Sequence, residues 1–161
     1  RSFDVVVNWN YTRGDEGIVF AHGGQHMGYV VFVAEGQLHF HSNANGVMTK
    51  LAPVRLGDTS QTFTLHVEAP GKREWVVRLS VDGVAQPSQC GFPQPFSFLP
   101  YEGIDIGMDR RSPVSWEIYQ NHGCYPFTGD IVDVMYLPGA YAPDEGPGAL
   151  MAALELGLAL E

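Results

Sequence analysis

Short segments with apolar residues at every second position run through most of this sequence, and they restrict the fold more than any other feature. Near the start, Val5, Val7 and Trp9 recur in this way, which predicts a strand with one buried face. Segments of β-branched and aromatic residues between turn formers predict further strands. These lie at 17–21, 28–34, 37–42, 47–51, 62–68, 74–81, 104–109 and 130–136.

The connections between these segments indicate how the strands pair. Glu35-Gly36 separates two predicted strands and Asp82-Gly83 follows another, and such links suit antiparallel hairpins, where positive φ is required. About ten strands spaced in this way are typical of sandwiches and barrels. Because one sheet this rich in Val, Phe and Trp would leave an apolar face in water, we expect two antiparallel sheets packed face to face. The sequence therefore predicts an all-β, two-sheet β-sandwich.

The end of the chain departs from the strand pattern. Residues 148–161 (GALMAALELGLALE) consist mostly of Ala, Leu, Met and Glu, which are strong helix formers. Pro143-Asp144-Glu145-Gly146-Pro147 precedes them as a turn-rich hinge. The predicted organisation is a β-sandwich domain over residues 1–142, followed by a hinge and a short C-terminal helix over residues 143–161.

The predicted C-terminal helix carries an apolar surface that needs a packing partner. Leu150, Leu154 and Leu158 form a stripe at helical spacing, and burial of several Leu side chains contributes about 1.5–3 kcal/mol each. The partner is the sandwich itself, an adjacent catalytic domain, or a second copy of the chain in a homodimer. A structural oligomerisation domain is therefore one of the functional alternatives.

Charge and hydropathy exclude two classes of partner. The 161 residues contain 9 Lys and Arg against 18 Asp and Glu, so the formal net charge is −9. Nucleic acids are bound through clustered Lys and Arg, and nucleic acid is therefore not expected as a partner. No stretch of the sequence approaches the roughly 20 apolar residues that a membrane-spanning helix needs, so a membrane partner is not expected either.

The cysteines and the first residues bear on the compartment. Cys90 and Cys124 lie in segments rich in Pro and Gly, and the sequence leaves open whether they form a disulfide or remain free thiols. Because a disulfide would require an oxidising compartment, a secreted or periplasmic location is slightly favoured. The chain begins Arg1-Ser2-Phe3 without an initiator Met, so we expect it to be processed or cut from a longer protein.

Several motifs resemble, in order and spacing, those of a known domain. The first group is EGIVFAHGG at 16–24, GYVVFV at 28–33 and EGQL at 35–38. Three later stretches follow in the same order: VRLSVDG at 77–83, DIGMDRRSPV at 105–114 and YPFTGDIVDV at 125–134. Together they span residues 16–136, and they resemble the C-terminal domain of arylsulfatase-type sulfatases.

This resemblance implies a laminin-G-like or concanavalin-like lectin fold of the jelly-roll type. In that family, sulfate ester hydrolysis belongs to a separate α/β domain with a Cys-x-Pro-x-Arg signature. Cys90 is followed by proline one place too late, and Cys124-Tyr125-Pro126 is followed by Thr128 where the Arg belongs. The chain is therefore expected to be no sulfatase, but a non-catalytic accessory or binding module that packs against a catalytic domain or binds glycan.

Asp105 and Asp109 are the candidate residues for catalysis and for metal binding. Glycosidases on lectin-like sandwiches need two carboxyl groups about 5–9.5 Å apart, whereas four residues along a strand separate these two Cα atoms by about 13 Å. A stand-alone glycan-active enzyme is therefore the alternative, not the main hypothesis. Asp105 and Asp109 are expected to cap turns or to pair with Arg110 or Arg111. A Ca²⁺ site is the second possibility for them, although this ion takes six to eight oxygen ligands; no other cofactor is expected.

The histidines are candidate zinc ligands, and the aromatic residues are numerous enough to form a sugar platform. His39 and His41 share one side of a predicted strand, but they alternate with Leu38 and Phe40 and are expected on the solvent face. Trp9 and Trp75, within alternating strands, are expected in the core.

Aromatic residues in predicted loops give the hypothesis for ligand binding. Trp116, Tyr119 and Tyr125 are expected to line a pocket, because aromatic rings stack on the faces of pyranoses. Arg110 and Arg111 are candidate partners for carboxylate or sulfate groups. The net charge of −9 favours short or neutral saccharides over long anionic chains.

Overall fold

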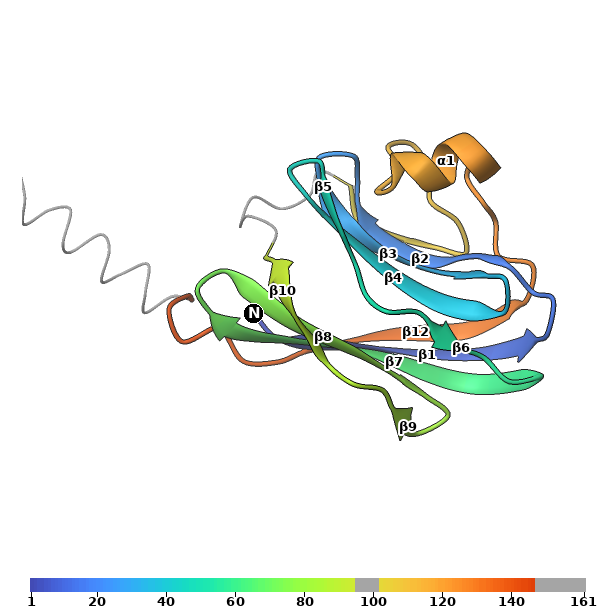
Figure 1. Ribbon diagram of the computed structural model, residues 1–161, viewed down its shortest axis with the longest axis horizontal. Coiled ribbons are helices and arrows are strands. Elements are labelled where there is room, and N and C mark those ends of the chain that lie inside the picture. The colour runs from blue at the N-terminus through green and yellow to red at the C-terminus, as the bar shows by residue number, and fades with distance from the viewer. Residues whose placement is uncertain (95–101, 147–161) are drawn as a thin grey trace, which may run out of the picture.

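The computed structural model describes residues 1–94 and 102–146, and these form two β-sheets and one short helix (Figure 1). Sheet A contains β1 (Phe3–Thr12), β7 (Thr59–Gly71), β8 (Glu74–Val81), β9 (Val84–Ala85), β10 (Gln89–Pro93) and β12 (Asp130–Pro138). Sheet B contains β2 (Gly17–Gly23), β3 (Met27–Ala34), β4 (Gln37–Ala44), β5 (Val47–Lys50), β6 (Val54–Arg55) and β11 (Ile104–Ile106). The helix is α1 (Trp116–His122).

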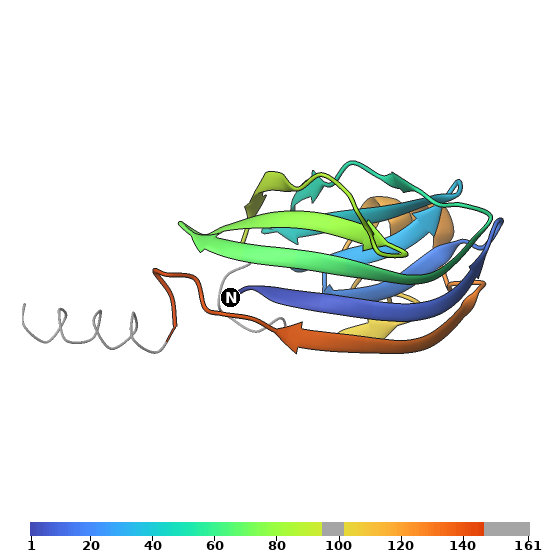
Figure 2. The same cartoon turned by 90° about the horizontal axis from the view of Figure 1, so that it is seen from below.

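The two sheets are antiparallel and pack face to face (Figures 1 and 2). The strand order of sheet A is β10-β8-β7-β1-β12, with β9 on β8, and that of sheet B is β11-β2-β3-β4-β5, with β6 on β4. The predicted all-β, two-sheet antiparallel sandwich is confirmed. The C-terminal helix predicted within residues 148–161 lies outside the described residues.

The predicted hairpin turns are confirmed by their backbone angles. Glu35 and Gly36 between β3 and β4 have φ of 52° and 69°, and Asp82 and Gly83 between β8 and β9 have φ of 47° and 79°. Two successive positive φ values are typical of the type I′ turn, whose twist matches that of the strands that it joins.

The main core lies between the sheets, and both tryptophans predicted for it are there. Trp9 and Trp75 are 1% and 6% exposed. The Trp9 ring packs against Phe63 at 4.8 Å and Phe127 at 5.6 Å between centroids. Its indole N–H donates to Ser60 Oγ at 3.1 Å, so the polar edge of this buried ring is satisfied.

A second apolar layer covers the outer face of sheet B. The cover segment, residues 107–127, crosses this face and carries α1 (Figure 1). Two backbone hydrogen bonds hold the cover segment in place. The Ile18 N–H donates to Tyr125 O, and the Phe127 N–H donates to Gly107 O, each with a length of 2.8 Å. Its buried apolar residues pack on those of β2 and β3; the cluster is Ile18, Ala21, Val30, Phe32, Val114, Ile118 and Tyr125.

Two sequence-based predictions are corrected by this segment. The strand expected at 104–109 is only three residues long, because Gly107 takes a φ of 79° and turns the chain away from the sheet. Trp116 and Tyr119, expected in a loop, lie on α1.

The two cysteines, for which the sequence left a disulfide open, are both free in the structure. Cys90 is an exposed free thiol, and Cys124 is a half-buried free thiol. The first belongs to β10 of sheet A, whereas the second follows α1 on the outer side of sheet B.

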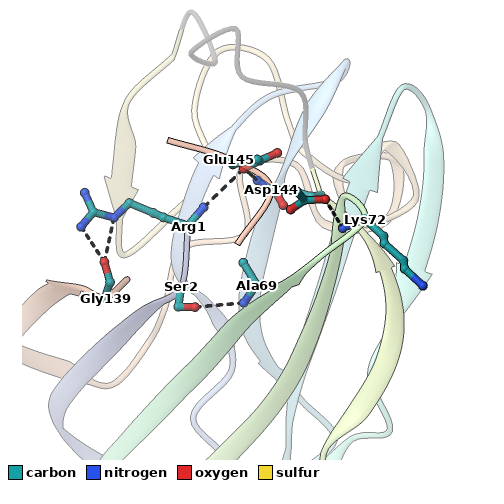
Figure 3. A network of polar contacts seen from close by, with 8 residues as sticks. Arg1, Ser2, Ala69, Lys72, Gly139, Asp144 and Glu145 are labelled. Carbon is teal, nitrogen blue, oxygen red and sulfur yellow. Dashed lines mark hydrogen bonds and ion pairs between the residues drawn. The ribbon is translucent and has the colours of Figure 1, made fainter. Parts of the chain in front are cut away.

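A polar network at one end of the sandwich ties the start of β1 to the residues after β12 (Figure 3). The Arg1 guanidinium donates to Gly139 O at a distance of 2.6 Å, and Ser2 Oγ accepts from the Ala69 N–H at 3.0 Å. Asp144 accepts a 2.6 Å hydrogen bond from an N–H of the β7–β8 turn. No helix within residues 1–94 and 102–146 has the length and apolar character needed to cross a membrane.

Candidate functional site

Helix α1 is short, but its sequence contains the signals that end a helix on both sides. Ser115 is the N-cap, and its Oγ accepts from the Ile118 N–H at 3.4 Å. Glu117 lies in the first turn, and Gly123 follows the last turn with a φ of 66° and donates its N–H to Tyr119 O. A Ser at the N-cap, an acidic residue in the first turn and a Gly after the last turn are ordinary signals of helix boundaries. These signals predict the helix from the sequence alone.

The helix turns one residue into the core and two aromatic residues outward. Ile118 is 7% exposed, whereas Trp116 is 52% and Tyr119 is 37% exposed. The Trp116 and Tyr119 rings stack at 5.4 Å between centroids with an angle of 25° between their planes. Stacking on Tyr119 restrains the indole of Trp116. The face of Trp116 that is not stacked is therefore the one available to a ligand.

A groove of about 500 Å³ lies beside Trp116. It is formed where the cover segment meets the β2–β3 turn and the β4–β5 hairpin, and its lining includes Gln25, Asn43, Gly46, Met48, Ser115, Trp116 and Glu117. It combines an aromatic ring and a thioether with polar side chains, which is the usual composition of a small-molecule site.

Asn43 joins the three segments that form the groove. Its Nδ2 donates to Gln25 O and to Val114 O, each at 2.9 Å. Its Oδ1 accepts from the Gly46 N–H, also at 2.9 Å. Because Asn43 is 4% exposed and its amide is fully engaged, it fixes the shape of the groove.

A charged pair forms one rim of the groove. Lys50 Nζ lies 2.8 Å from Glu117 Oε2. The hydrogen bond and the positive charge of Lys50 lower the pKa of Glu117, so this rim carries an ionised carboxylate. Both side chains are largely exposed, and such a pair contributes little to stability.

His39 and His41 do lie on the face of β4 opposite Leu38 and Phe40, but this face is only partly open to solvent. His41 is 7% exposed, and the ring of His39 stacks on Phe32 at 4.7 Å. Burial, with the positive charge of Lys50, lowers the pKa of His41 to about 4. The expectation of a solvent face is therefore wrong for His41, whereas His39 is partly exposed.

Among the residues predicted for the pocket, only Trp116 lines the groove. Tyr125 is 9% exposed, and its hydroxyl lies 3.2 Å from both Val33 O and Glu16 Oε2, which share its single proton. Burial raises the pKa of Tyr125 to about 12. Tyr125 is thus a structural residue, while Arg110 and Arg111 are exposed on a part of the cover segment outside the groove lining.

Asp105 and Asp109 both hold the backbone of the cover segment. Asp105 Oδ2 accepts from the Arg110 N–H at 3.0 Å, and Asp109 Oδ2 accepts from the Val114 N–H at 2.8 Å. Burial raises the pKa of Asp109 to about 6. Within the described parts of the chain, no group of three or more His, Cys, Asp or Glu residues is placed to hold a metal ion.

The groove contains residues that sequence analysis did not select. Gln25, Asn43 and Met48 come from hairpin ends far from Trp116 in the sequence. The only local signal was the Asn45-Gly46 pair, whose φ values of 54° and 83° are those of a tight β4–β5 turn.

Comparison with a solved pentraxin structure agrees with the fold. A native heptameric SAP-like pentraxin from Limulus polyphemus aligns with a TM-score of 0.51 and 12% identity over 84% of this chain. The alignment covers 63% of the pentraxin chain. Sheep galectin-11 in complex with glycerol aligns with a TM-score of 0.43 and 11% identity, over 84% of this chain and 90% of the galectin. No protein-family model and no curated protein sequence matches significantly.

The pentraxin likeness defines the class of fold, which is a lectin-like, concanavalin-like β-sandwich. This is the coarser part of the resemblance seen in the sequence, and it is confirmed. The solved structures named above do not support the arylsulfatase family itself.

Proposed function

We propose that this chain is a saccharide-binding module and that the Trp116 groove is its binding site. The observation that carries the proposal is the exposed, supported face of Trp116 beside a groove with fixed polar walls. The C–H-rich face of a pyranose stacks on such a ring, and hydrogen bonds from the walls then fix its orientation.

The polar groups of the groove indicate a neutral ligand. Gln25 presents a side-chain amide at the β2–β3 turn, and Glu117 and Lys50 supply a carboxylate and an ammonium at the rim. Arg110 and Arg111 lie outside the lining, so they add no anion-binding element there. With a net charge of −9, the chain is suited to short neutral saccharides.

A glycan array on the purified chain, followed by titration of the best hit, tests this proposal. We expect Trp116→Ala to weaken binding about tenfold or more, because an aromatic contact contributes about 0.5–1.5 kcal/mol beyond its buried area. Tyr141→Ala is the matched control, since Tyr141 is a similarly exposed aromatic residue, at 51%, outside the groove. Equal binding by Trp116→Ala, or an array without hits, contradicts the proposal.

A second candidate function is that of an accessory domain packed against another domain, as the resemblance to sulfatases implies. It is favoured by the edge strand β12, on which Val132, Met135 and Leu137 are 61%, 44% and 49% exposed. An exposed apolar strip of this kind is typical of interaction surfaces. Because the Cys-x-Pro-x-Arg signature is absent from the sequence, we infer no sulfatase activity in either case. Met135→Glu with Leu137→Glu would leave saccharide binding unchanged and abolish docking to a host domain.

A further inference from the structure

The outer face of sheet A carries a chain of three polar side chains that sequence analysis did not single out. Asp4 on β1 pairs directly with His66 on β7, and Ser80 on β8 pairs with the neighbouring Thr64. His66 Nδ1 lies 3.0 Å from Asp4 Oδ1, and His66 Nε2 lies 2.9 Å from Ser80 Oγ. The imidazole thus bridges a carboxylate and a hydroxyl through its two nitrogens.

The chemistry of the partners fixes the direction of these hydrogen bonds. An ionised carboxylate only accepts, so the neutral imidazole must carry its proton on Nδ1 and donate it to Asp4. Nε2 is then left with a lone pair that accepts the hydroxyl proton of Ser80. This is the arrangement by which a carboxylate orients a histidine that in turn activates a serine.

A cation and a groove lie next to this relay. Arg78 pairs directly with His66 and lies two residues before Ser80 on the same exposed face of β8, so its Cα is about 7 Å from that of Ser80. A groove of about 410 Å³ borders the relay at Asp4, His66 and Arg78, and its apolar lining includes Val76 and Leu137. Ser80 lies outside the lining, at the edge where His66 meets it.

The groove is accessible, and part of its lining is held in place by hydrogen bonds. The side chains of His66 and Asp4 are 26% and 44% exposed, so a ligand has access to both. The groove also includes Ser2 and Gly139, which belong to the network of Figure 3 that holds the start of β1. The backbone two residues before Asp4 is thereby fixed.

We propose that Ser80 is an activated nucleophile and that this face of sheet A hydrolyses short, uncharged carboxylic esters. Ser80 Oγ forms a bond to the ester carbonyl carbon while its proton passes to His66 Nε2, and Arg78 stabilises the negative charge on the carbonyl oxygen. The bond to the alcohol oxygen breaks, and that oxygen takes the proton from His66. Water then attacks the acyl-Ser80 ester through the same base, which releases the carboxylic acid and restores the Ser80 hydroxyl.

The surrounding charges set the substrate class. Asp4 and Glu68 both border the groove, and their negative charges disfavour anionic substrates. The acyl or alcohol group is expected to lie along the apolar part of the groove, with the carbonyl between Ser80 and Arg78. Asp4 touches no reacting atom, so it is a positioning residue for His66.

Covalent labelling of the full chain with an alkyl fluorophosphonate tests the proposal. The expected result is one adduct per chain, formed with loss of fluoride and located on Ser80 by peptide mass spectrometry. Ser80→Ala should give no adduct, and His66→Gln should slow labelling at least a hundredfold. Arg78→Met should slow it by a similar factor, and Asp4→Asn should lower the limiting labelling rate while leaving the apparent affinity for the probe unchanged.

Matched controls separate reactivity from structure and from saccharide binding. Thr64→Val changes the cross-strand neighbour of Ser80 on the same face and should label like the wild type, and Trp116→Ala on the other sheet should do the same. Hydrolysis of 4-nitrophenyl acetate with an initial burst should follow the same order among the variants. No adduct, an adduct on another residue, or wild-type labelling of His66→Gln would overturn the assignment.

Discussion

The outer faces of the two sheets differ in what covers them. Along β1 of sheet A, buried residues alternate with partly exposed ones for most of the strand. Along β2 and β3 of sheet B, nearly every residue is buried, because the core lies on one side and the cover segment on the other. An alternating strand therefore marks a face left to solvent, whereas a continuous apolar run such as GYVVFV at 28–33 marks a strand covered on both sides.

This difference separates the two proposed sites. The Trp116 groove depends on the cover segment, because Trp116, Ser115 and Glu117 belong to it. The Asp4–His66–Ser80 relay depends only on strand register within the open face of sheet A. A change that loosens the cover segment is therefore expected to affect the first site and to spare the second.

The largest expected effect comes from removing a ring beneath the cover segment. Phe32 is 6% exposed on the outer face of sheet B, and Phe32→Ala should lower the free energy of unfolding by about 3–5 kcal/mol. Thr64→Ala, on the open face of sheet A, should change it by less than about 0.5 kcal/mol. Urea unfolding of both variants measures this, and equal losses would remove the distinction between the two faces.

The next largest expected loss of stability tests the close approach between the cover segment and β2. Gly17 has a φ of +119°, and a Cβ there would lie 2.3 Å from Pro126 O. Gly17→Ala should therefore cost about 3 kcal/mol, from backbone strain and from displacement of the cover segment. Gly36→Ala is the matched control, because it has a φ of +69° and open space around it, and it should cost only about 1 kcal/mol. Similar losses from the two changes would contradict the close approach.

Asp109 should make the stability of the covered side depend on pH. Burial raises its pKa to about 6, above the value of about 3.9 in an unfolded chain. The folded state thus holds the proton more tightly, so this group lowers the free energy of unfolding as the pH rises from about 4 to 6, by about 1–3 kcal/mol. Asp109→Asn should remove that loss.

The measurement is a series of denaturant titrations of wild type and Asp109→Asn between pH 4 and pH 7. Comparison at each pH is needed because His41, whose pKa burial lowers to about 4, gives a slope of the opposite sign over part of this range. The difference between variant and wild type should grow in favour of the variant as pH rises. A constant difference would show that Asp109 is not held in a desolvated position.

The smallest expected loss of stability concerns the N-terminus of α1. Ser115→Ala removes the N-cap acceptor for the Ile118 N–H and should cost about 1 kcal/mol. Ser88→Ala, at an exposed position on the other sheet's side, should be close to neutral. Thermal unfolding of the two variants measures the difference in stability. A neutral Ser115→Ala would indicate that packing of Ile118 alone holds the helix.

The sequence by itself determined most of the long strands, the hairpin turns and the tryptophans of the core. A period of two and pairs such as Asp82-Gly83 are local properties, and they act through the nearest neighbours along the chain. The burial of Trp9 and Trp75 follows from the same periodicity, because alternate residues of a strand lie on opposite faces. For these features, the expectation and the structure agree.

Only the tertiary structure decided which outer face is covered and which side chains meet. Residues 4, 66 and 80 form one hydrogen-bonded chain, and Asn43 joins segments 18 and 71 residues away, through contacts that no local pattern encodes. Their meeting depends on strand order and register, which are set by the packing of the whole domain and not by neighbouring residues. For the same reason, the sequence placed Tyr125 in a ligand pocket and His41 on a solvent face, whereas the structure buries both side chains.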